Sequence, residues 1–260
     1  MSESDQYFQG KGEVHRTLKR LAQRLDEFEI NYVVVGGLAM YKHGYIRFTD
    51  DVDLLVTRDA LKEIHRRLDG LGYLPPFSGS KNLRDTDNGV KIEFLVTGEF
   101  PGDGKPKPVA FPNPDAVATD EAGIRYINLP ALIELKLASG MTNIDRAKDI
   151  GDVVELIKAA NLPIEFGDSL NPFVQEKYRE LWKGIHTANR YVVVWSKKRG
   201  AAQLQAMLAD GVTLDPRPVA AEDHVLLVTT DPEIAKKYGM HDEREFMSFS
   251  EGSIEERNEK

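Results

Sequence analysis

The chain has 260 residues, of which 41% are hydrophobic and 29% are charged, and this balance is typical of a folded globular protein and excludes a disordered one. It contains no cysteine, which excludes disulfides, thiolate metal ligands and a cysteine nucleophile, and its net charge of −8 is unlike that of a protein that coats nucleic acid. Segment 1–9 lacks the apolar core of a signal peptide and no apolar run approaches the roughly 18 residues that a membrane span needs, so we expect a cytoplasmic protein with no membrane partner.

The first half of the chain alternates between helix and strand patterns. Apolar residues at three- and four-residue spacing predict an amphipathic helix over 14–29, and the β-branched run Tyr32–Val35 predicts a buried strand after it. Gly36-Gly37 ends this strand before a short helix over 38–43. The elements expected next are a strand over 51–57, a helix over 60–68 with Asp59 as N-cap and Gly70 as its stop, a strand over 90–96 and a loop rich in glycine and proline over 97–115.

The second half of the chain begins with helical patterns and then changes in composition. Helices are predicted over 130–139, 145–160 and 171–189. A small α/β unit of unknown role follows, with strands over 191–195 and 224–229 and helices over 201–209 and 232–238. We therefore expect a first domain over 1–165, a helical connector over 166–190, the small α/β unit over 191–245 and a disordered tail over 246–260.

Two aspartates on the second predicted strand form the first part of a candidate site. Side chains at alternate positions of a strand share a face, so Asp51 and Asp53 point to one side while Val52 and Leu54 point to the other. Adjacent carboxylates repel each other unless a cation lies between them, and oxygen ligands of this kind suit Mg²⁺. By the same alternation, Asp50 is expected to face away from the site.

The glycine pair and a third acid complete the candidate site. Gly36-Gly37 leaves backbone N–H groups uncovered at the end of a strand, which is a geometry that can hold a phosphate. Glu93 is a lone acid in an apolar strand, and it would join Asp51 and Asp53 in a two-metal site if its strand lies beside theirs. Phosphate and carboxylates together indicate a metal-bound nucleoside triphosphate.

The same residues resemble a known family. The pattern of a glycine pair, an Asp-x-Asp strand and a later acid resembles the DNA polymerase β-type nucleotidyltransferase superfamily, and more narrowly the minimal bacterial nucleotidyltransferases that include AbiEii-type toxins of toxin–antitoxin pairs. The resemblance covers about residues 14–160 and leaves out the C-terminal unit. It is carried by Gly36-Gly37-Leu38-Ala39, by Arg47-x-Thr49-x-Asp51-Val52-Asp53-Leu54, and by Leu135-Lys136-Leu137-Ala138 with Arg146-x-Lys148-Asp149-x-x-Asp152.

The resemblance implies a fold, a reaction and roles for residues. The fold would be α/β (α+β), with a mixed sheet and packed helices in a nucleotidyltransferase core over 1–165. The reaction would transfer a nucleoside monophosphate from a triphosphate such as ATP to an acceptor and release pyrophosphate. The implied catalytic and metal-binding residues are Asp51, Asp53 and Glu93 with two Mg²⁺ ions or Mn²⁺ in their place, and the implied nucleotide-binding residues are Gly36, Gly37, Thr49, Arg47, Lys136 and Lys148.

Several alternatives stay open at the level of single residues. Many relatives have Gly-Ser where this chain has Gly-Gly, so phosphate binding must rely on the backbone or on Thr49. Arg47 and Thr49 also suit a loop-capping role, and Glu93 would give the same pattern on an edge strand. Lys136 and Lys148 could be solvated helix residues, paired with acids such as Glu134 and Asp152.

Alternatives also remain for the function. The acceptor could be an RNA end, a protein hydroxyl or a small molecule, although the charge pattern over 81–107 shows no basic face that would favour RNA. A nucleotide-binding module without turnover would carry the same motifs. A toxin-like component of a toxin–antitoxin pair would use the C-terminal unit to dock a protein partner.

Overall fold

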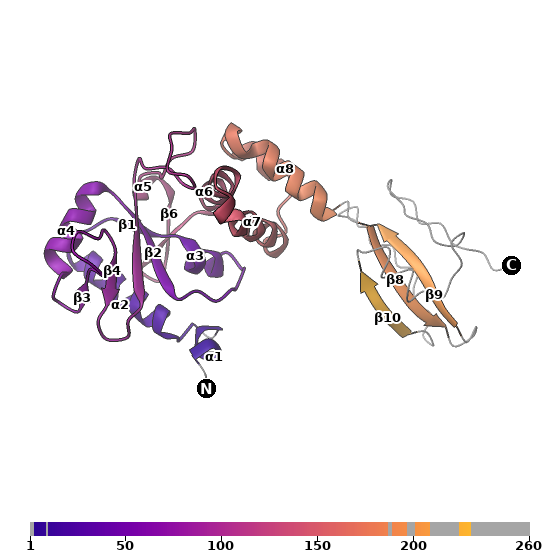
Figure 1. The fold of residues 1–260 in the computed structure, drawn as a ribbon, viewed down its shortest axis with the longest axis horizontal. Helices are drawn as coiled ribbons and strands as arrows, with labels where there is room; N and C mark the ends of the chain where they lie inside the picture. The colour runs from indigo at the N-terminus through magenta and orange to yellow at the C-terminus, as the bar shows by residue number, and fades with distance from the viewer. Residues whose placement is uncertain (1–2, 9, 187–188, 197–200, 209–223, 230–260) are drawn as a thin grey trace. The chain divides into compact units, whose positions relative to one another are not determined.

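The computed structural model describes residues 3–8, 10–186, 189–196, 201–208 and 224–229 (Figure 1). The chain divides into two compact units, Met1–Arg179 and Glu180–Lys260. Among the described residues, no helix is both long enough and apolar enough to cross a membrane. The candidate site lies entirely in the first unit.

The first unit is built on a mixed sheet. Its described strands have the order β3-β4-β5-β2-β1-β7-β6. β2 pairs with β5 in parallel and with β1 in antiparallel orientation, so the expected mixed sheet with packed helices is confirmed. The strands are β1 (Tyr32–Val34), β2 (Asp51–Val56), β3 (Tyr73–Leu74), β4 (Leu83–Asp85), β5 (Lys91–Val96), β6 (Ala118–Glu121) and β7 (Ile124–Ile127).

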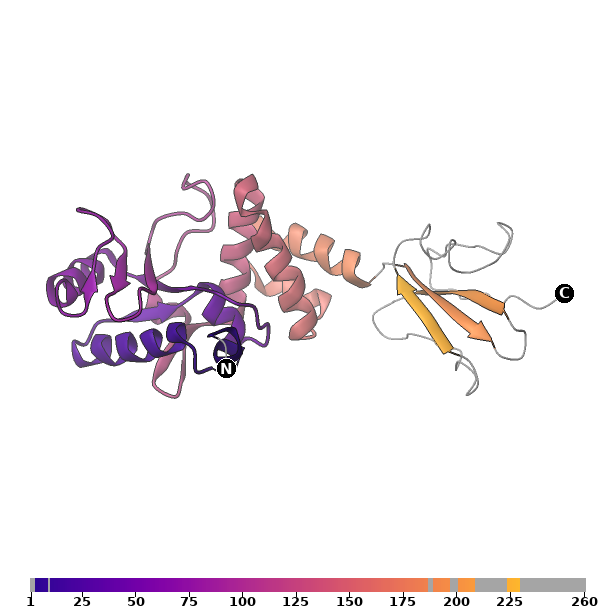
Figure 2. The ribbon, with the colours of Figure 1, turned by 60° about the horizontal axis from the view of Figure 1, so that its bottom comes forward.

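One face of this sheet carries the hydrophobic core. Val52 and Leu54 of β2 and Phe94 of β5 are fully buried, and they pack with the apolar stripe of helix α2 and with Ile64 and Leu68 of α4. In Figure 2, α2 runs along the sheet. Because strand side chains alternate, the residues between these apolar ones point to the opposite face, where the candidate site is.

The predicted helices of this unit occur in the expected order, whereas α1 and α5 were not predicted and the helix expected over 171–189 ends at His186. The helices of this unit and its boundary are α1 (Glu3–Phe8), α2 (Glu13–Glu27), α3 (Gly36–Lys42), α4 (Arg58–Leu68), α5 (Pro114–Val117), α6 (Leu129–Thr142), α7 (Ala147–Ala159) and α8 (Pro172–His186). α6 and α7 pack against each other, and their apolar residues Leu132, Leu137, Val153 and Leu156 are buried. The 3-10 helix Ile144–Arg146 precedes α7, so this helix begins two residues later than expected.

Two details of the sequence interpretation were wrong. The N-cap of α4 is Thr57, whose hydroxyl accepts a hydrogen bond of 3.1 Å from the backbone N–H of Ala60, and Asp59 lies in the first turn instead. The segment predicted as a helix over 201–209 forms strand β9 (Ala201–Leu208), because it pairs along its whole length with β8 (Asn189–Ser196). Pairing with a neighbouring strand can override local helix propensity.

The second unit contains a small sheet with the order β10-β8-β9, in which β10 is His224–Thr229. The strands expected over 191–195 and 224–229 are therefore confirmed. The short helix expected over 232–238 and the tail expected over 246–260 lie outside the described residues.

Candidate active site

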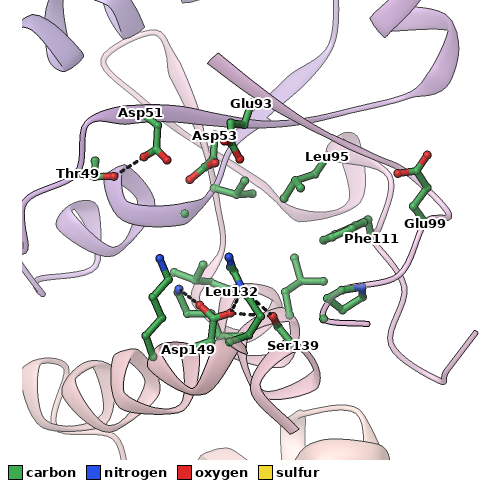
Figure 3. A pocket seen from close by; sticks show the side chains of 18 of the residues that line it. Thr49, Asp51, Asp53, Glu93, Leu95, Glu99, Phe111, Leu132, Ser139 and Asp149 are labelled. Atoms are coloured by element: carbon green, nitrogen blue, oxygen red, sulfur yellow. Dashed lines mark hydrogen bonds and ion pairs between the residues drawn. The ribbon is translucent and has the colours of Figure 1, made fainter. Parts of the chain in front are cut away.

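The three predicted acids meet on neighbouring strands. In the parallel pair β2–β5, Asp51 lies opposite Lys91 and Asp53 lies opposite Glu93. This register puts Asp51, Asp53 and Glu93 on the same face, and one carboxylate oxygen from each lies within 4.8 Å of the others. Figure 3 shows the three side chains pointing into one pocket. β5 lies inside the sheet, between β4 and β2, which excludes the edge-strand alternative for Glu93.

The surroundings of these acids favour a bound cation. Burial raises the pKa of Asp53 to about 7, and the negative charges of Asp51 and Glu93 add to this effect. No basic side chain forms an ion pair with Asp53 among the described residues. A cluster of hard oxygen ligands that repel one another is the donor set that Mg²⁺ or Mn²⁺ prefers, so these residues fit a divalent metal.

The glycine pair lies directly against the acids. Gly36 begins α3 with a φ of +62°, and a Cβ atom at this position would lie 1.7 Å from Oδ2 of Asp53. A Cβ atom on Gly37 would lie 2.8 Å from Cβ of Thr49, whose hydroxyl donates a hydrogen bond to Asp51. Only glycine therefore lets the backbone come this close to the carboxylates. The N–H groups of the first turn of α3 have no carbonyl of a preceding turn as a hydrogen-bond acceptor, so they are open to a ligand.

The opposite wall of the pocket comes from α6 and α7 (Figure 3). The side chain of Lys136 is 8% exposed, and its ammonium donates hydrogen bonds of 3.1 Å to Asp149 and 2.6 Å to Asp152. Asp149 also accepts hydrogen bonds from Ser139 at 2.7 Å and from Arg146 at 2.9 Å. Lys136 is therefore part of a buried charge network: the alternative of a solvated lysine is wrong for it, while the pairing with Asp152 that this alternative included is confirmed.

The two other predicted cations differ in their partners. Arg47 donates two hydrogen bonds to Asp152, of 3.1 and 3.2 Å, and so connects the segment before β2 to α7. Lys148 lines the same pocket, has an exposed side chain, and forms no ion pair with any residue in the described part of the chain. Asp50 was expected to face away, but it lies before β2 at the rim of the same pocket, where its side chain is 70% exposed and 3.5 Å from Lys91.

The pocket is a cavity of about 580 Å³ between the sheet and the helical wall. This volume is within the range that cofactor and substrate sites have. Of its remaining lining residues the sequence singled out only Leu135, as part of the motif on α6, because the others belong to no recognisable motif. The remaining lining residues include Lys81, Leu95, Glu99, Phe100, Pro101, Gly102, Phe111, Leu132, Leu135 and Ser139.

Comparisons with known proteins give only distant similarities. No protein-family model and no curated protein matches the sequence. A solved structure described as a nucleotidyltransferase of Thermotoga maritima is 19% identical with a TM-score of 0.39, and the match covers 52% of this chain and 89% of that one. A nucleotidyltransferase-like protein of Paracoccidioides brasiliensis is 17% identical, and the antibiotic-resistance factor ANT(2'')-Ia is 16% identical. Both have TM-scores of 0.39 and matches over 65% of this chain and 90% of theirs. At these values the function must be argued from the site itself.

The repulsion among the acids gives a first prediction. We expect Asp53→Asn to raise the melting temperature of the metal-free protein at pH 8, because it removes one of three like charges from a buried cluster. Added Mg²⁺ should raise the melting temperature of the unaltered protein, since a bound ligand stabilises the folded state. The same substitution should abolish this increase. Thermal denaturation with and without Mg²⁺ measures both effects. Asp50→Asn is the matched control, and an equal Mg²⁺ effect in both variants would contradict the prediction.

Proposed function

We propose that this chain is a metal-dependent nucleotidyltransferase, which transfers a nucleoside monophosphate from a nucleoside triphosphate to an acceptor hydroxyl and releases pyrophosphate. The observation that carries the proposal is the meeting of Asp51, Asp53 and Glu93 on adjacent parallel strands, with oxygens within 4.8 Å of one another, beside the bare glycine turn at Gly36.

The acids have distinct roles in this proposal. Asp51 and Asp53 hold two Mg²⁺ ions, or Mn²⁺ in their place, and Glu93 holds one of them and accepts the proton of the attacking hydroxyl. When bound there, such ions would supply the positive charge that polarises the α-phosphate and neutralises the leaving pyrophosphate. The hydroxyl of Thr49 donates to Asp51, which leaves the other oxygen of this carboxylate for a metal.

The triphosphate is proposed to lie between the glycine turn and the helical wall. Gly36 and Gly37 offer backbone N–H groups, and Lys148 offers an ammonium that no described carboxylate neutralises. Lys136 and Arg47 face the nucleotide from within their ion pairs with Asp152, which fix their orientation. Their positive charges attract the negative charges of the phosphates, which is how electrostatic stabilisation lowers the barrier of phosphoryl transfer.

A labelling experiment tests the proposal and finds the acceptor. The protein would be incubated with Mg²⁺, a bacterial lysate and a nucleoside triphosphate labelled on the α-phosphate, with ATP as the first donor. We expect label to pass to one class of acceptor, which can be separated as RNA, protein or small molecules. The variant Asp53→Ala should transfer none, and equal labelling by both proteins would overturn the proposal. Consumption of ATP also separates this function from nucleotide binding without turnover.

The glycine turn gives a second prediction. In Gly36→Ala the new methyl group would occupy the space of the Asp53 carboxylate, and the φ of +62° adds strain of about 1 kcal/mol. We expect the melting temperature to lose its dependence on Mg²⁺ and ATP. Gly151→Ala is a suitable control, because a Cβ atom there meets no atom within 4 Å and alanine favours the helix α7. An undiminished effect of Mg²⁺ and ATP in Gly36→Ala would show that the turn does not contact the nucleotide.

A further inference from the structure

The loop between β5 and α5 forms one side of the pocket. After Glu93, the next side chain on the same face of β5 is Leu95, and the chain then enters the loop 97–113. Leu95 and the loop residues Phe100, Pro101 and Phe111 all line the cavity. The loop is closed at its base by two backbone hydrogen bonds between residues 98–99 and Phe111, of 2.9 and 2.8 Å. This side of the pocket is therefore a defined, mostly apolar wall.

A buried lysine holds this wall in place. The side chain of Lys107 is only 6% exposed, which is costly for a charged group unless its donors are satisfied. Its ammonium donates to the backbone carbonyl of Pro101, to the carboxylate of Asp103 and, at 3.3 Å, to the hydroxyl of Thr142. Three donors thus meet three acceptors. Two acceptors belong to the loop and the third belongs to α6, so Lys107 joins the loop to this helix.

A second contact joins the same loop to the same helix. Gly102 has a φ of +76°, and a Cβ atom there would lie 2.7 Å from the backbone oxygen of Ser139. The side-chain amide of Asn143 donates a hydrogen bond of 3.3 Å to the carbonyl of Gly102. α6 also carries Lys136 and Ser139 of the charge network, so the loop wall and the helical wall are fixed as one surface.

The position of the wall relative to the acids points to its ligand. In Figure 3, Thr49 lies on one side of Asp53 and Glu93, and Leu95 and Phe111 lie on the other. In phosphoryl transfer the attacking and leaving oxygens are roughly in line, on opposite sides of the phosphorus atom. For a triphosphate bound on the glycine turn with its leaving group towards Thr49, an acceptor in line with it would approach Glu93 from the side of the loop.

We propose that Lys107 is a positioning residue, which clamps the loop 97–113 to α6 so that the loop wall binds the acceptor next to Glu93. This proposal rests on the proposed nucleotidyltransferase function. It implies that Lys107 affects the binding of the acceptor but neither the binding of the triphosphate nor the chemical step.

The variant Lys107→Met tests the clamp, because methionine keeps the length of the side chain and removes its three donors. Lys105→Met is the matched control, since Lys105 lies two residues away on the same loop with an exposed side chain. Gly102→Ala is a second variant, because its new methyl group would disturb the contact between the loop and α6 without changing Lys107. It replaces Lys107→Met in the test if Lys107→Met does not fold. Hydrogen exchange, the shift in melting temperature with Mg²⁺ and ATP, and labelling at increasing lysate concentration would be measured for each.

We expect the amides of residues 99–111 to exchange about tenfold faster in Lys107→Met and in Gly102→Ala, with those of β2 and β5 unchanged. The lysate concentration for half-maximal labelling should rise about tenfold, while the maximal rate and the effect of ATP change less than twofold. Unchanged exchange would overturn the clamp, and a fall in the maximal rate alone would overturn the acceptor role. An unaltered protein that transfers no label would overturn the acceptor role together with the proposed function, while exchange would still report on the clamp.

Discussion

Replacement of Asp51 by asparagine should reduce the rate of nucleotidyl transfer by about a thousandfold, while replacement of the adjacent Asp50 should change it less than twofold. Asp51 offers an oxygen within 4.8 Å of those of Asp53 and Glu93, whereas the Asp50 side chain is 70% exposed, pairs with Lys91 and is not part of this group of acids. Loss of a metal ligand removes several kcal/mol of transition-state stabilisation, and each 1.36 kcal/mol is worth a factor of ten in rate.

The two aspartates make a strict comparison because they are neighbours in sequence and carry the same charge. Asp51→Asn and Asp50→Asn therefore change the net charge equally, and they differ in whether the altered carboxylate belongs to the group of three acids. Initial rates of label transfer from an α-labelled triphosphate, at saturating Mg²⁺, measure the difference. Similar rates for the two variants would show that the carboxylate at position 51 has no part in the chemistry.

Lys136→Met should destabilise the fold by about 3 kcal/mol, the lower end of the range measured when one partner of a buried ion pair is removed, because Arg146 and Arg47 still pair with Asp149 and Asp152. Asp149 and Asp152 would keep their charges in a buried site where Lys136 now satisfies both. Urea denaturation of the two proteins measures the change in the free energy of unfolding. Lys148→Met is the control, because its exposed side chain has no ion pair among the described residues and surface substitutions usually stay within about 0.5 kcal/mol.

The same network predicts a pH dependence. Burial alone would raise the pKa of Asp149, but the charge of Lys136 and the hydrogen bond from Ser139 outweigh it and hold this pKa below its usual value. A lowered pKa in the folded state stabilises the protein above the unfolded pKa of about 3.9, and this stability is lost as the pH falls below that value. In Lys136→Met the loss of stability in acid should be smaller. An equally steep loss would contradict the role of Lys136.

The acids of the site could be predicted from the sequence because strand alternation decides the face of each residue. Asp53 and Glu93 each stand between apolar neighbours and Asp51 lies two residues before Asp53, so their common side follows once β2 and β5 are adjacent. The sequence could not show that adjacency, nor the parallel register that places Asp53 beside Glu93. These depend on pairing between segments about forty residues apart.

Other features depend on contacts that leave no local pattern. The sequence left open whether Lys136 is a nucleotide-binding or a solvated helix lysine, and its burial follows only from the packing of α6 against α7. The clamp at Lys107 depends on Thr142, which is 35 residues away in the chain. The strand β9 was mistaken for a helix because its pairing with β8 was not visible in its own composition.

The most direct test of the account is the position of a metal in a crystal of this protein. Crystals grown with Mn²⁺ and a non-hydrolysable ATP analogue would be measured at a wavelength where Mn²⁺ scatters anomalously. The account predicts anomalous peaks between the carboxylates of Asp51, Asp53 and Glu93, with the phosphates against Gly36. Mn²⁺ and phosphates bound elsewhere, with these three carboxylates free of metal, would contradict it.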